Sequence, residues 1–356
     1  MVNTILKSIK PNNTPKSTIS LKQNLSSINE LVAPVIKQLL SQDVESGNAE
    51  AVLYQCEIGG KRIRPALVVL SGQVFGCQIG DLLYPAASIE ILHNSTLIID
   101  DIIDHSLLRR DEPTCWNKFG KSFAECMSPT YMAAVFAGLS HVKNGTRLID
   151  LYSKTIKVVI DGEIKDILFE RSGREDEAYV VENRYKVISM ADYLGMIGQK
   201  TAALLQACCM AGAICAEASE DQVEIIGDFG FNLGMAFQIR DDILDIFGDE
   251  KEFGKKIGKD IIEKKMGNFI ILSAIEQLDS DDQCTIFGLL TGTSEISETD
   301  IATITALIKK TDAESLAQST ASAYVEKAFV SLGKLPRNEY TARLKEIANY
   351  IIFRKE

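Results

Sequence analysis

The sequence predicts an all-α protein, folded as one large helical bundle. No proline occurs between Pro129 and Pro336, and because proline breaks helix interiors, this long interval favours continuous helices. The alternation of apolar and polar residues that marks strands is scarce throughout the chain. Residues 85–104 and 222–247 are apolar on nearly all sides, as expected of helices that lie in the middle of a bundle.

The chain of 356 residues shows no repeat or shift in composition that would divide it into domains. Residues 1–20 are rich in Asn, Ser, Thr, Lys and Pro, a composition that predicts a frayed or disordered arm. A transit peptide is disfavoured because no arginine precedes Arg62. Residues 21–356 are expected to form a single helical domain.

The composition argues against several classes of protein. The chain carries 38 basic and 49 acidic residues, a formal charge of −11, which disfavours nucleic-acid binding. No run of eighteen apolar residues occurs, so no transmembrane segment is expected. The eight cysteines include no Cys-x-x-Cys pair. Buried thiols in a reducing compartment, and hence a cytoplasmic protein, are therefore expected rather than a disulfide framework or a zinc site.

The chain carries one acidic motif twice. Asp-Asp-x-x-Asp occurs at 100–104 and again at 241–245, each time inside an apolar segment. In a helix the first and fifth residues lie on one face, so each copy presents a pair of carboxylates. Because an isolated buried charge is very costly, a cation should bind there, and all-oxygen ligands suit Mg²⁺. The acidic residues concerned are Asp100, Asp101, Asp104, Asp241, Asp242 and Asp245.

Basic residues accompany both copies of the motif. Arg109 and Arg110 follow the first copy, Gly-Gly-Lys-Arg-Ile-Arg-Pro stands upstream at 59–65, and Gly-Lys-Lys-Ile-Gly-Lys-Asp follows the second copy at 254–260. Arginine forks and lysine ammonium groups are common phosphate ligands. Carboxylates for a metal beside cations for phosphate predict a diphosphate as the natural ligand.

These motifs, in this order, resemble the trans-prenyltransferase, or polyprenyl diphosphate synthase, family. The resemblance runs from about residue 59 to about residue 271 and includes Lys200-Thr201 and Gly-Met-Ala-Phe-Gln at 234–238. The stretch 258–268 is most similar to archaeal members. The resemblance implies an isoprenoid-synthase helical bundle with a central active-site cavity. It also implies Mg²⁺-dependent, head-to-tail condensation of isopentenyl diphosphate with an allylic diphosphate to give a linear all-trans polyprenyl diphosphate.

The resemblance implies roles for individual residues. Two or three Mg²⁺ ions would be held by Asp100, Asp104 and Asp241, and the other aspartates of the two motifs would complete ligation or fix waters. Thr201 and Gln238 would line the reacting carbons and offer oxygen dipoles to an allylic cation. The residues implied to assist the allylic diphosphate are Arg109, Lys200, Lys255 and Lys265, and those implied to bind isopentenyl diphosphate are Lys61, Arg64, His93 and Arg110. The catalytic set comprises the six aspartates with Lys200 and Gln238.

The sequence departs from the family pattern in four places. Ile99 stands where many members have His, Asp111 where they have Gly, Ser128-Pro129 where they have Gly-Asp, and Asn268 ends the stretch in which they have Lys-x-Thr. No departure removes a predicted metal ligand. The departures leave open whether the entrance and the preferred primer differ from those of other members.

Small residues before the first aspartate motif bear on product length. The growing chain is expected to run down that helix, so Thr96 and Ser95, four and five residues before Asp100, would form its floor. Small side chains there would let the chain reach the next turn, about 5.4 Å deeper, which is roughly one isoprene unit. The residues on that turn are Ile91, Leu92 and Ser88. A product of about 25 carbons is therefore predicted, with about 20 the nearest alternative; in the competing interpretation Ser95 and Thr96 only pack against a neighbouring helix.

Two other functions stay open at this point. A class I terpene cyclase shares the first motif and the helical fold, but its second metal site usually carries an Asn/Ser/Glu-type triad, whereas the second motif here is all aspartate. A non-catalytic subunit of a heteromeric synthase would be expected to have lost aspartates or basic residues that this chain keeps. Because family members are commonly homodimers, a homodimer is predicted. The exact product, the preferred allylic primer and the downstream pathway stay undetermined.

Overall fold

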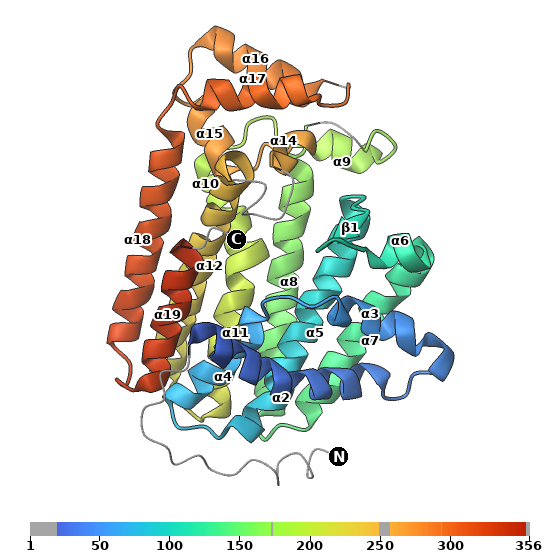
Figure 1. Ribbon diagram of the computed structural model, residues 1–356, viewed down its shortest axis with the longest axis vertical. Coiled ribbons are helices and arrows are strands. Elements are labelled where there is room, and N and C mark those ends of the chain that lie inside the picture. Colours follow the sequence, from blue (N-terminus) through green and yellow to red (C-terminus); the bar gives the residue numbers. More distant parts are fainter. Residues whose placement is uncertain (1–19, 172–173, 249–256, 293, 354–356) are drawn as a thin grey trace. The chain divides into compact units, whose positions relative to one another are not determined.

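Helices dominate the part of the chain that the structure describes (Figure 1), which confirms the predicted all-α fold. The computed structural model describes residues 20–171, 174–248, 257–292 and 294–353. Of the expected arm at 1–20, only Ser20 lies within the described residues. Its side chain accepts a hydrogen bond from the backbone N–H of Gln23 and so caps the first described helix.

The helices vary from single turns to nearly eight turns. Those of the first half are α2 (Leu21–Ser41), η1 (Ser46–Asn48), α3 (Ala49–Glu57), α4 (Ile63–Val74), α5 (Ile79–Ile103), α6 (Cys115–Phe119), α7 (Lys121–Ser140) and α8 (Gly145–Phe169). Those that follow are α9 (Ala178–Asn183), α10 (Met190–Ile197), the π-helical turn η2 (Gly198–Ala202), α11 (Ala203–Cys215), α12 (Glu220–Phe247), α14 (Lys259–Ile262), α15 (Phe269–Ile275), α16 (Ser280–Thr291), α17 (Glu298–Ile308), α18 (Ala313–Gly333) and α19 (Glu339–Phe353). None of the helices in the described ranges is both long and apolar enough to cross a membrane.

The chain divides into two compact units. Unit 1 comprises Met1–Lys154, Ala207–Gly227 and Gly333–Glu346. Unit 2 comprises Thr155–Gln206, Asp228–Leu332 and Ile347–Glu356. The single domain expected over 21–356 stays a prediction.

Helix α5 is the central helix of unit 1. It packs against α2, α3, α4, α6 and α7 (Figure 1), and Leu82, Ile89, Ile91 and Leu92 along it are fully buried. Contact with neighbours on so many sides explains why this segment is apolar around its whole circumference. The carboxyl-terminal end of α5 carries the first aspartate motif, so the buried part of the helix anchors that motif.

Two short strands follow α5. Strand β1 (Leu108–Arg109) pairs antiparallel with β2 (Glu112–Pro113). The two residues between them, Arg110 and Asp111, have φ of 55° and 65°, and positive φ at both positions is the signature of a type I′ hairpin turn. Asp tolerates this left-handed conformation better than most residues other than Gly. The departure at Asp111 is therefore compatible with the turn.

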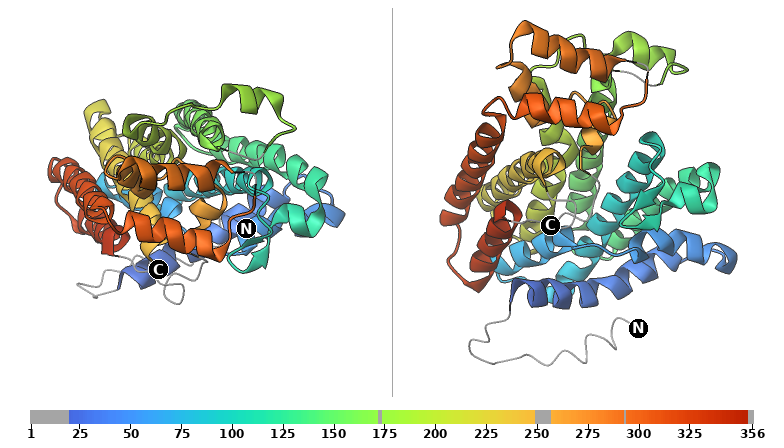
Figure 2. Two further views of the ribbon diagram at one scale, coloured as in Figure 1. Left: turned by 90° about the horizontal axis from the view of Figure 1, so that it is seen from above. Right: turned by 45° about the horizontal axis from the view of Figure 1, so that its top comes forward.

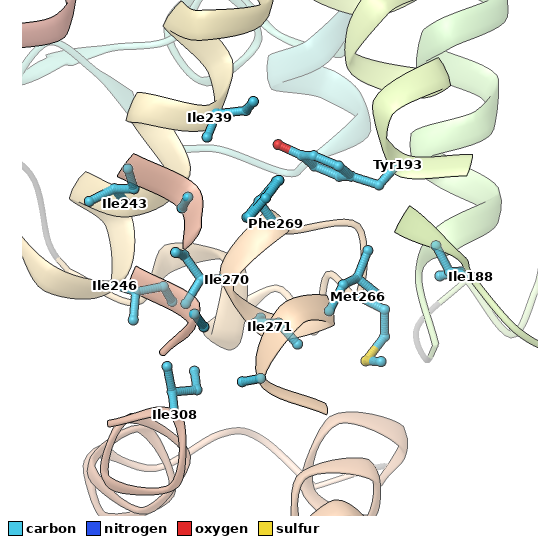
Figure 3. Packing of buried hydrophobic residues seen from close by; sticks show 14 of the residues in the cluster. Ile188, Tyr193, Ile239, Ile243, Ile246, Met266, Phe269, Ile270, Ile271 and Ile308 are labelled. Carbon is cyan, nitrogen blue, oxygen red and sulfur yellow. The ribbon is translucent and has the colours of Figure 1, made fainter. Parts of the chain in front are cut away.

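The core of unit 2 joins α10, α12, α15 and α17. Figure 3 shows Tyr193, Ile239, Phe269 and Ile308, from these four helices, among its buried residues. The rings of Tyr193 and Phe269 meet edge to face, with centroids 5.9 Å apart. Helices α16 and α17 lie side by side in every view (Figures 1 and 2). This core supports the start of α15 against α12, the helix that carries the second aspartate motif.

Within unit 1, α4 and α11 meet at backbone contact. A Cβ atom added to Gly212 of α11 would lie 2.2 Å from the carbonyl oxygen of Val68 and 2.6 Å from the backbone nitrogen of Gly72, both on α4. Neither neighbour is the end of a flexible side chain, so neither can move aside cheaply. Glycine at 212 thus allows an approach that any larger residue would prevent.

We expect Gly212→Ala to lower the free energy of unfolding by about 1–3 kcal/mol, because the added methyl group must push the two backbones apart. Denaturant unfolding followed by circular dichroism measures the change. Gly288→Ala, where an added Cβ meets nothing within 4 Å, is the matched control and should be neutral or slightly stabilising. Equal losses in both variants would contradict the close approach.

Candidate active site

In the first aspartate motif, Asp101 is bound by an arginine. Its side chain is 1% exposed and accepts from Arg109, whose Nη2 lies 2.7 Å from Oδ1 and whose Nε lies 2.9 Å from Oδ2. Such a fork is the strong geometry for an arginine–carboxylate pair. Because Arg109 belongs to β1, this pair fastens the hairpin to the end of α5. Asp100 and Asp104, one helical turn apart, are half-buried.

The hairpin brings Arg110 onto the glycine turn before α4. A Cβ atom added to Gly60 would lie 2.7 Å from Cζ of Arg110, so the guanidinium packs directly on this glycine. Gly60 has φ 137°, a conformation that favours glycine in its own right. Lys61 is the next residue and is exposed. The predicted isopentenyl diphosphate residues Lys61 and Arg110 are thereby neighbours, although the sequence separates them widely.

His93 is the partner of Arg64. Arg64 donates from Nη1 to Nε2 of His93 at 3.0 Å, and because a guanidinium only donates, this contact assigns the imidazole proton to Nδ1. Burial lowers the pKa of His93 well below its ordinary value, and the charges of Arg64, Arg110 and Arg109 lower it further. His93 therefore stays neutral near pH 7 and orients a cation.

Falling pH should destabilise the fold, because His93 takes up a proton more readily in the unfolded state than in the folded state. Because the folded-state pKa of His93 lies below the unfolded value, the stabilisation is complete above the unfolded pKa, about 6.5, and is lost as pH falls. Between pH 7.5 and 5.5, the free energy of unfolding of the wild type should fall by about 1 kcal/mol more than that of His93→Gln, which keeps a hydrogen-bond acceptor but cannot titrate. Denaturant unfolding at the two pH values measures this difference. The exposed His141→Gln is the control, and identical pH dependence in the wild type and His93→Gln would disprove the assignment.

In the second aspartate motif, Asp242 is the buried residue. It is 4% exposed, and its Oδ2 accepts from the Tyr193 hydroxyl at 2.7 Å and from the Phe269 backbone N–H at 2.8 Å. Its Oδ1 accepts from Gln238 at 3.2 Å. Burial, followed by the charge of Asp260, raises the pKa of Asp242 well above its ordinary value in spite of these donors. Asp242 therefore ties α12 to α10 and α15, while Asp241 beside it is half-buried.

Asp245 holds the segment that begins α14. Its Oδ1 accepts from the backbone N–H of Lys259 at 3.0 Å and its Oδ2 from that of Asp260 at 3.1 Å. Burial, then the charge of Asp260, raises the pKa of Asp245 to about 7. Asn268 donates to Asp260 at 2.8 Å and also accepts from the backbone N–H groups that begin α15. The departure at Asn268 thus has a capping role.

Lys200 and Thr201 lie in the π-helical turn η2, a rare conformation that frequently marks functional sites. The turn packs on α8 at backbone distance, since a Cβ atom added to Gly162 would lie 2.4 Å from the backbone nitrogen of Lys200. Thr201 donates to Gln238 at 3.0 Å. Thr201, Gln238 and Asp242 are therefore linked in one hydrogen-bonded chain.

Two carboxylates of α8 contact Lys200. Its Nζ lies 2.7 Å from Oε2 of Glu163 and 2.6 Å from Oδ2 of Asp166. Lys265 Nζ lies 4.0 Å from the same oxygen of Asp166 and 3.1 Å from Oε2 of Glu263. Although burial alone would raise it, the pKa of Asp166 lies below its ordinary value because of the Lys200 and Lys265 charges.

These groups surround a cavity of about 120 Å³ within unit 2. Its polar lining consists of three carboxylates, two ammonium groups, a hydroxyl and an amide. The residues are Asp166, Asp242, Asp260, Lys200, Lys265, Thr201 and Gln238, with Met196, Ile197 and Gly267 completing the wall. The predicted residues Lys200, Thr201, Gln238, Asp242 and Lys265 thus share one cavity, whereas Lys255 lies outside the described residues.

The family model described as polyprenyl synthetase matches residues 47–308. The chain belongs to the polyprenyl synthetase family. A geranylgeranyl diphosphate synthase of Sulfolobus acidocaldarius is 32% identical over 333 residues, which cover 91% of this chain and 96% of that protein. Heptaprenyl diphosphate synthase component 2 of Bacillus subtilis is 33% identical over 324 residues, which cover 90% of this chain and 87% of that protein.

Solved structures agree with this assignment. The crystal structure of a geranylgeranyl pyrophosphate synthetase from Pyrococcus horikoshii matches with a TM-score of 0.83 at 26% identity and covers 93% of this chain and 98% of that one. The predicted family, the isoprenoid-synthase helical fold and the enzyme class, a prenyltransferase, are confirmed. Relatives named for products of different length show that family membership alone does not determine the product.

For this polyprenyl synthetase, two of the residues expected near the floor of the chain site, Ser95 and Ser88, contact α7. Ser95 Oγ is 3.0 Å from Ser128 Oγ, and Ser88 donates to the Val135 carbonyl at 3.5 Å. Ser95 and Ser88 are 3% and 0% exposed, and Ile91 and Leu92 are also fully buried. Thr96 is half-buried and donates to the His93 carbonyl at 2.9 Å. The departure at Ser128 therefore contacts the predicted floor itself.

Several residues of the site were missed by sequence reasoning. Tyr193 holds Asp242, and Glu163 and Asp166 hold Lys200. The spacing of Glu163 and Asp166, three residues apart in one helix, is a signal of two carboxylates on one helix face. Tyr193 has no comparable signal, because an aromatic residue in an apolar helix normally indicates only core packing.

Proposed function

We propose that this prenyltransferase condenses isopentenyl diphosphate with an allylic diphosphate, head to tail and with Mg²⁺, to give a linear all-trans polyprenyl diphosphate. The observation that supports this proposal most is that the two aspartate motifs are built alike. In each motif the middle aspartate is buried and bonded to protein donors, whereas Asp100, Asp104 and Asp241 are half-buried. The buried aspartate positions the motif, and the less buried carboxylates are the proposed metal ligands.

The donor chemistry suits Mg²⁺. Asp100, Asp104 and Asp241 offer carboxylate oxygens, the hard ligands that Mg²⁺ prefers. No group of three or more His, Cys, Asp or Glu in the described ranges is placed to hold a metal by itself. Mg²⁺ commonly takes one or two carboxylates and completes its shell with water and substrate phosphate. We therefore propose two or three ions that bind together with diphosphate.

The reaction breaks the allylic carbon–oxygen bond, forms a bond to the isopentenyl double bond, and releases a proton to the departing diphosphate. Bound metal would supply positive charge for that leaving group. Lys200 and Lys265 would assist it, and the dipoles of Thr201 and Gln238 would face the cationic carbon. In unit 1, Lys61, Arg64, His93 and Arg110 would bind isopentenyl diphosphate. Arg109 is bonded to Asp101, so we propose that it positions this aspartate in addition to assisting the allylic diphosphate.

We expect Asp100→Ala and Asp241→Ala each to lower kcat by about 10²–10³, because each removes one group that stabilises charge in the transition state. Steady-state assays at saturating Mg²⁺ measure the loss, and circular dichroism checks the fold. Asp161→Ala, on an exposed position of α8, controls for the loss of a carboxylate. More than half of wild-type activity in either active-site variant would refute the metal assignment.

Two alternative functions are a class I terpene cyclase and a non-catalytic subunit of a heteromeric synthase. The Bacillus subtilis relative is named as one component of a synthase, but this chain keeps the aspartates and basic residues that a non-catalytic subunit would be expected to lose. Incubation of the purified chain with Mg²⁺, isopentenyl diphosphate and each allylic primer separates the three. Elongated linear products support the proposal, cyclic products support a cyclase, and inactivity supports a missing partner. A homodimer is proposed on the family resemblance, and a cytoplasmic location on the eight cysteines without a Cys-x-x-Cys pair.

The proposed product has about 25 carbons, with about 20 as the nearest alternative. Small hydroxyl side chains at Ser95 and Ser128 meet between α5 and α7. A growing prenyl chain that passes this pair would next meet the turn of α5 at Ile91 and Leu92. Ser95 and Ser128 together are the proposed narrow point of the chain site, and the small size of both side chains leaves room for the chain to reach that next turn.

We expect Ser95→Phe to shorten the product by about one isoprene unit or more, because the ring must occupy the space beside Ser128. Chromatographic sizing of the products measures the change. Ser122→Phe, at an exposed position on α7, tests whether an added ring anywhere on these helices has the same effect. An unchanged distribution at a comparable rate would place the floor on another helix.

A further inference from the structure

Lys200 is held between two carboxylates. The side chains of Glu163 and Asp166 are 8% and 11% exposed, and that of Lys200 is 23% exposed. Two short ion pairs in such a setting interact strongly, because water screens them little. They also occupy two of the three N–H donors of the ammonium group.

Around Lys200 and Lys265, the carboxylates that pair with them outnumber the ammonium groups. Lys200 and Lys265 supply two positive charges, whereas Glu163, Asp166 and Glu263, which pair with them, supply three negative charges. Asp242 and Asp260 add further carboxyl groups to the cavity wall. Within the described part of the chain, the residues that line this cavity therefore offer a diphosphate no net positive charge. Bound metal ions would add to its attraction.

Glu163 and Asp166 differ in what they hold. Asp166 lies near both lysines and lines the cavity, so its removal would change the surroundings of both. Glu163 pairs with Lys200 through a side chain that the close approach of Gly162 to the π turn brings into reach. The negative charge of Glu163 weakens the attraction of Lys200 for a second anion, in addition to orienting its ammonium group.

We propose that Glu163 limits the affinity of the allylic subsite for diphosphate and thereby favours release of the pyrophosphate product. This inference rests on the proposed function, in which Lys200 contacts the allylic diphosphate. Tight binding that is equal in the ground state and the transition state does not raise kcat, and product release limits many enzymes. A carboxylate that weakens binding of the pyrophosphate product therefore favours its release.

The test is the affinity of the full chain for inorganic pyrophosphate with Mg²⁺, measured by isothermal titration calorimetry and as an inhibition constant. Glu163→Gln keeps an acceptor for Lys200 but removes the charge. It should bind pyrophosphate about 3- to 30-fold more tightly, as expected for one charge at close range after partial screening. KM for the allylic diphosphate should fall while KM for isopentenyl diphosphate stays unchanged.

Two further variants make each outcome decisive. Asp161→Asn removes one charge from an exposed position on the same helix and should leave pyrophosphate affinity unchanged; an equal gain there would overturn the inference in favour of a general charge effect. Lys200→Ala should weaken binding. Glu163→Gln with wild-type affinity or weaker, beside a weakened Lys200→Ala, overturns the role of Glu163 and leaves the proposed function standing. If Glu163→Gln and Lys200→Ala both bind pyrophosphate with wild-type affinity, diphosphate does not contact Lys200, and that part of the proposed function is wrong. If Glu163→Gln fails to fold, Glu163→Ala replaces it, with the same expectation.

Discussion

The cost of burying a carboxylate governs how both aspartate motifs are built. Asp101 and Asp242 are 1% and 4% exposed, and a buried charge without donors would be strongly destabilising. Unit 1 meets this requirement with the Arg109 fork. Unit 2 meets it with the Tyr193 hydroxyl, the Phe269 backbone N–H and the Gln238 amide. The donors differ in chemistry, yet both sets fasten a neighbouring element to the helix that carries the motif.

Fastening these elements positions the remaining groups. The Arg109 fork orders a hairpin whose type I′ turn holds Arg110 at φ 55°, and strain of this kind in a residue other than Gly persists where the surrounding contacts determine it. The guanidinium then rests on Gly60, beside Lys61. In unit 2 the hydrogen bonds of Asp242 continue through Gln238 to Thr201. Thr201 in turn shares the π turn with Lys200. The buried aspartates therefore organise residues that lie far from them in sequence.

The same groups explain how far sequence reasoning reaches. The two motifs, the basic segment at 59–65, Lys200-Thr201 and Gln238 stand out because each is a polar pattern in an apolar or glycine-rich setting. The partners of the buried aspartates do not stand out in this way. Tyr193 looks like an ordinary core aromatic, and the donor that Phe269 contributes is its backbone N–H, which any residue except proline carries. Glu163 and Asp166 show the correct spacing, but their target, Lys200, lies on another helix.

The sequence by itself determined the helical class, the family motifs and the kinds of charge available, because helix periodicity and residue chemistry are local properties. It also placed each pair of flanking aspartates on one helix face. Tertiary structure alone decided that the middle aspartates are buried, that Arg109 is forked on Asp101, and that two carboxylates surround Lys200. Burial and pairing depend on which surfaces pack together. That packing arises from contacts between residues distant in the chain, such as Gly162 against the turn at Lys200, which no local pattern encodes.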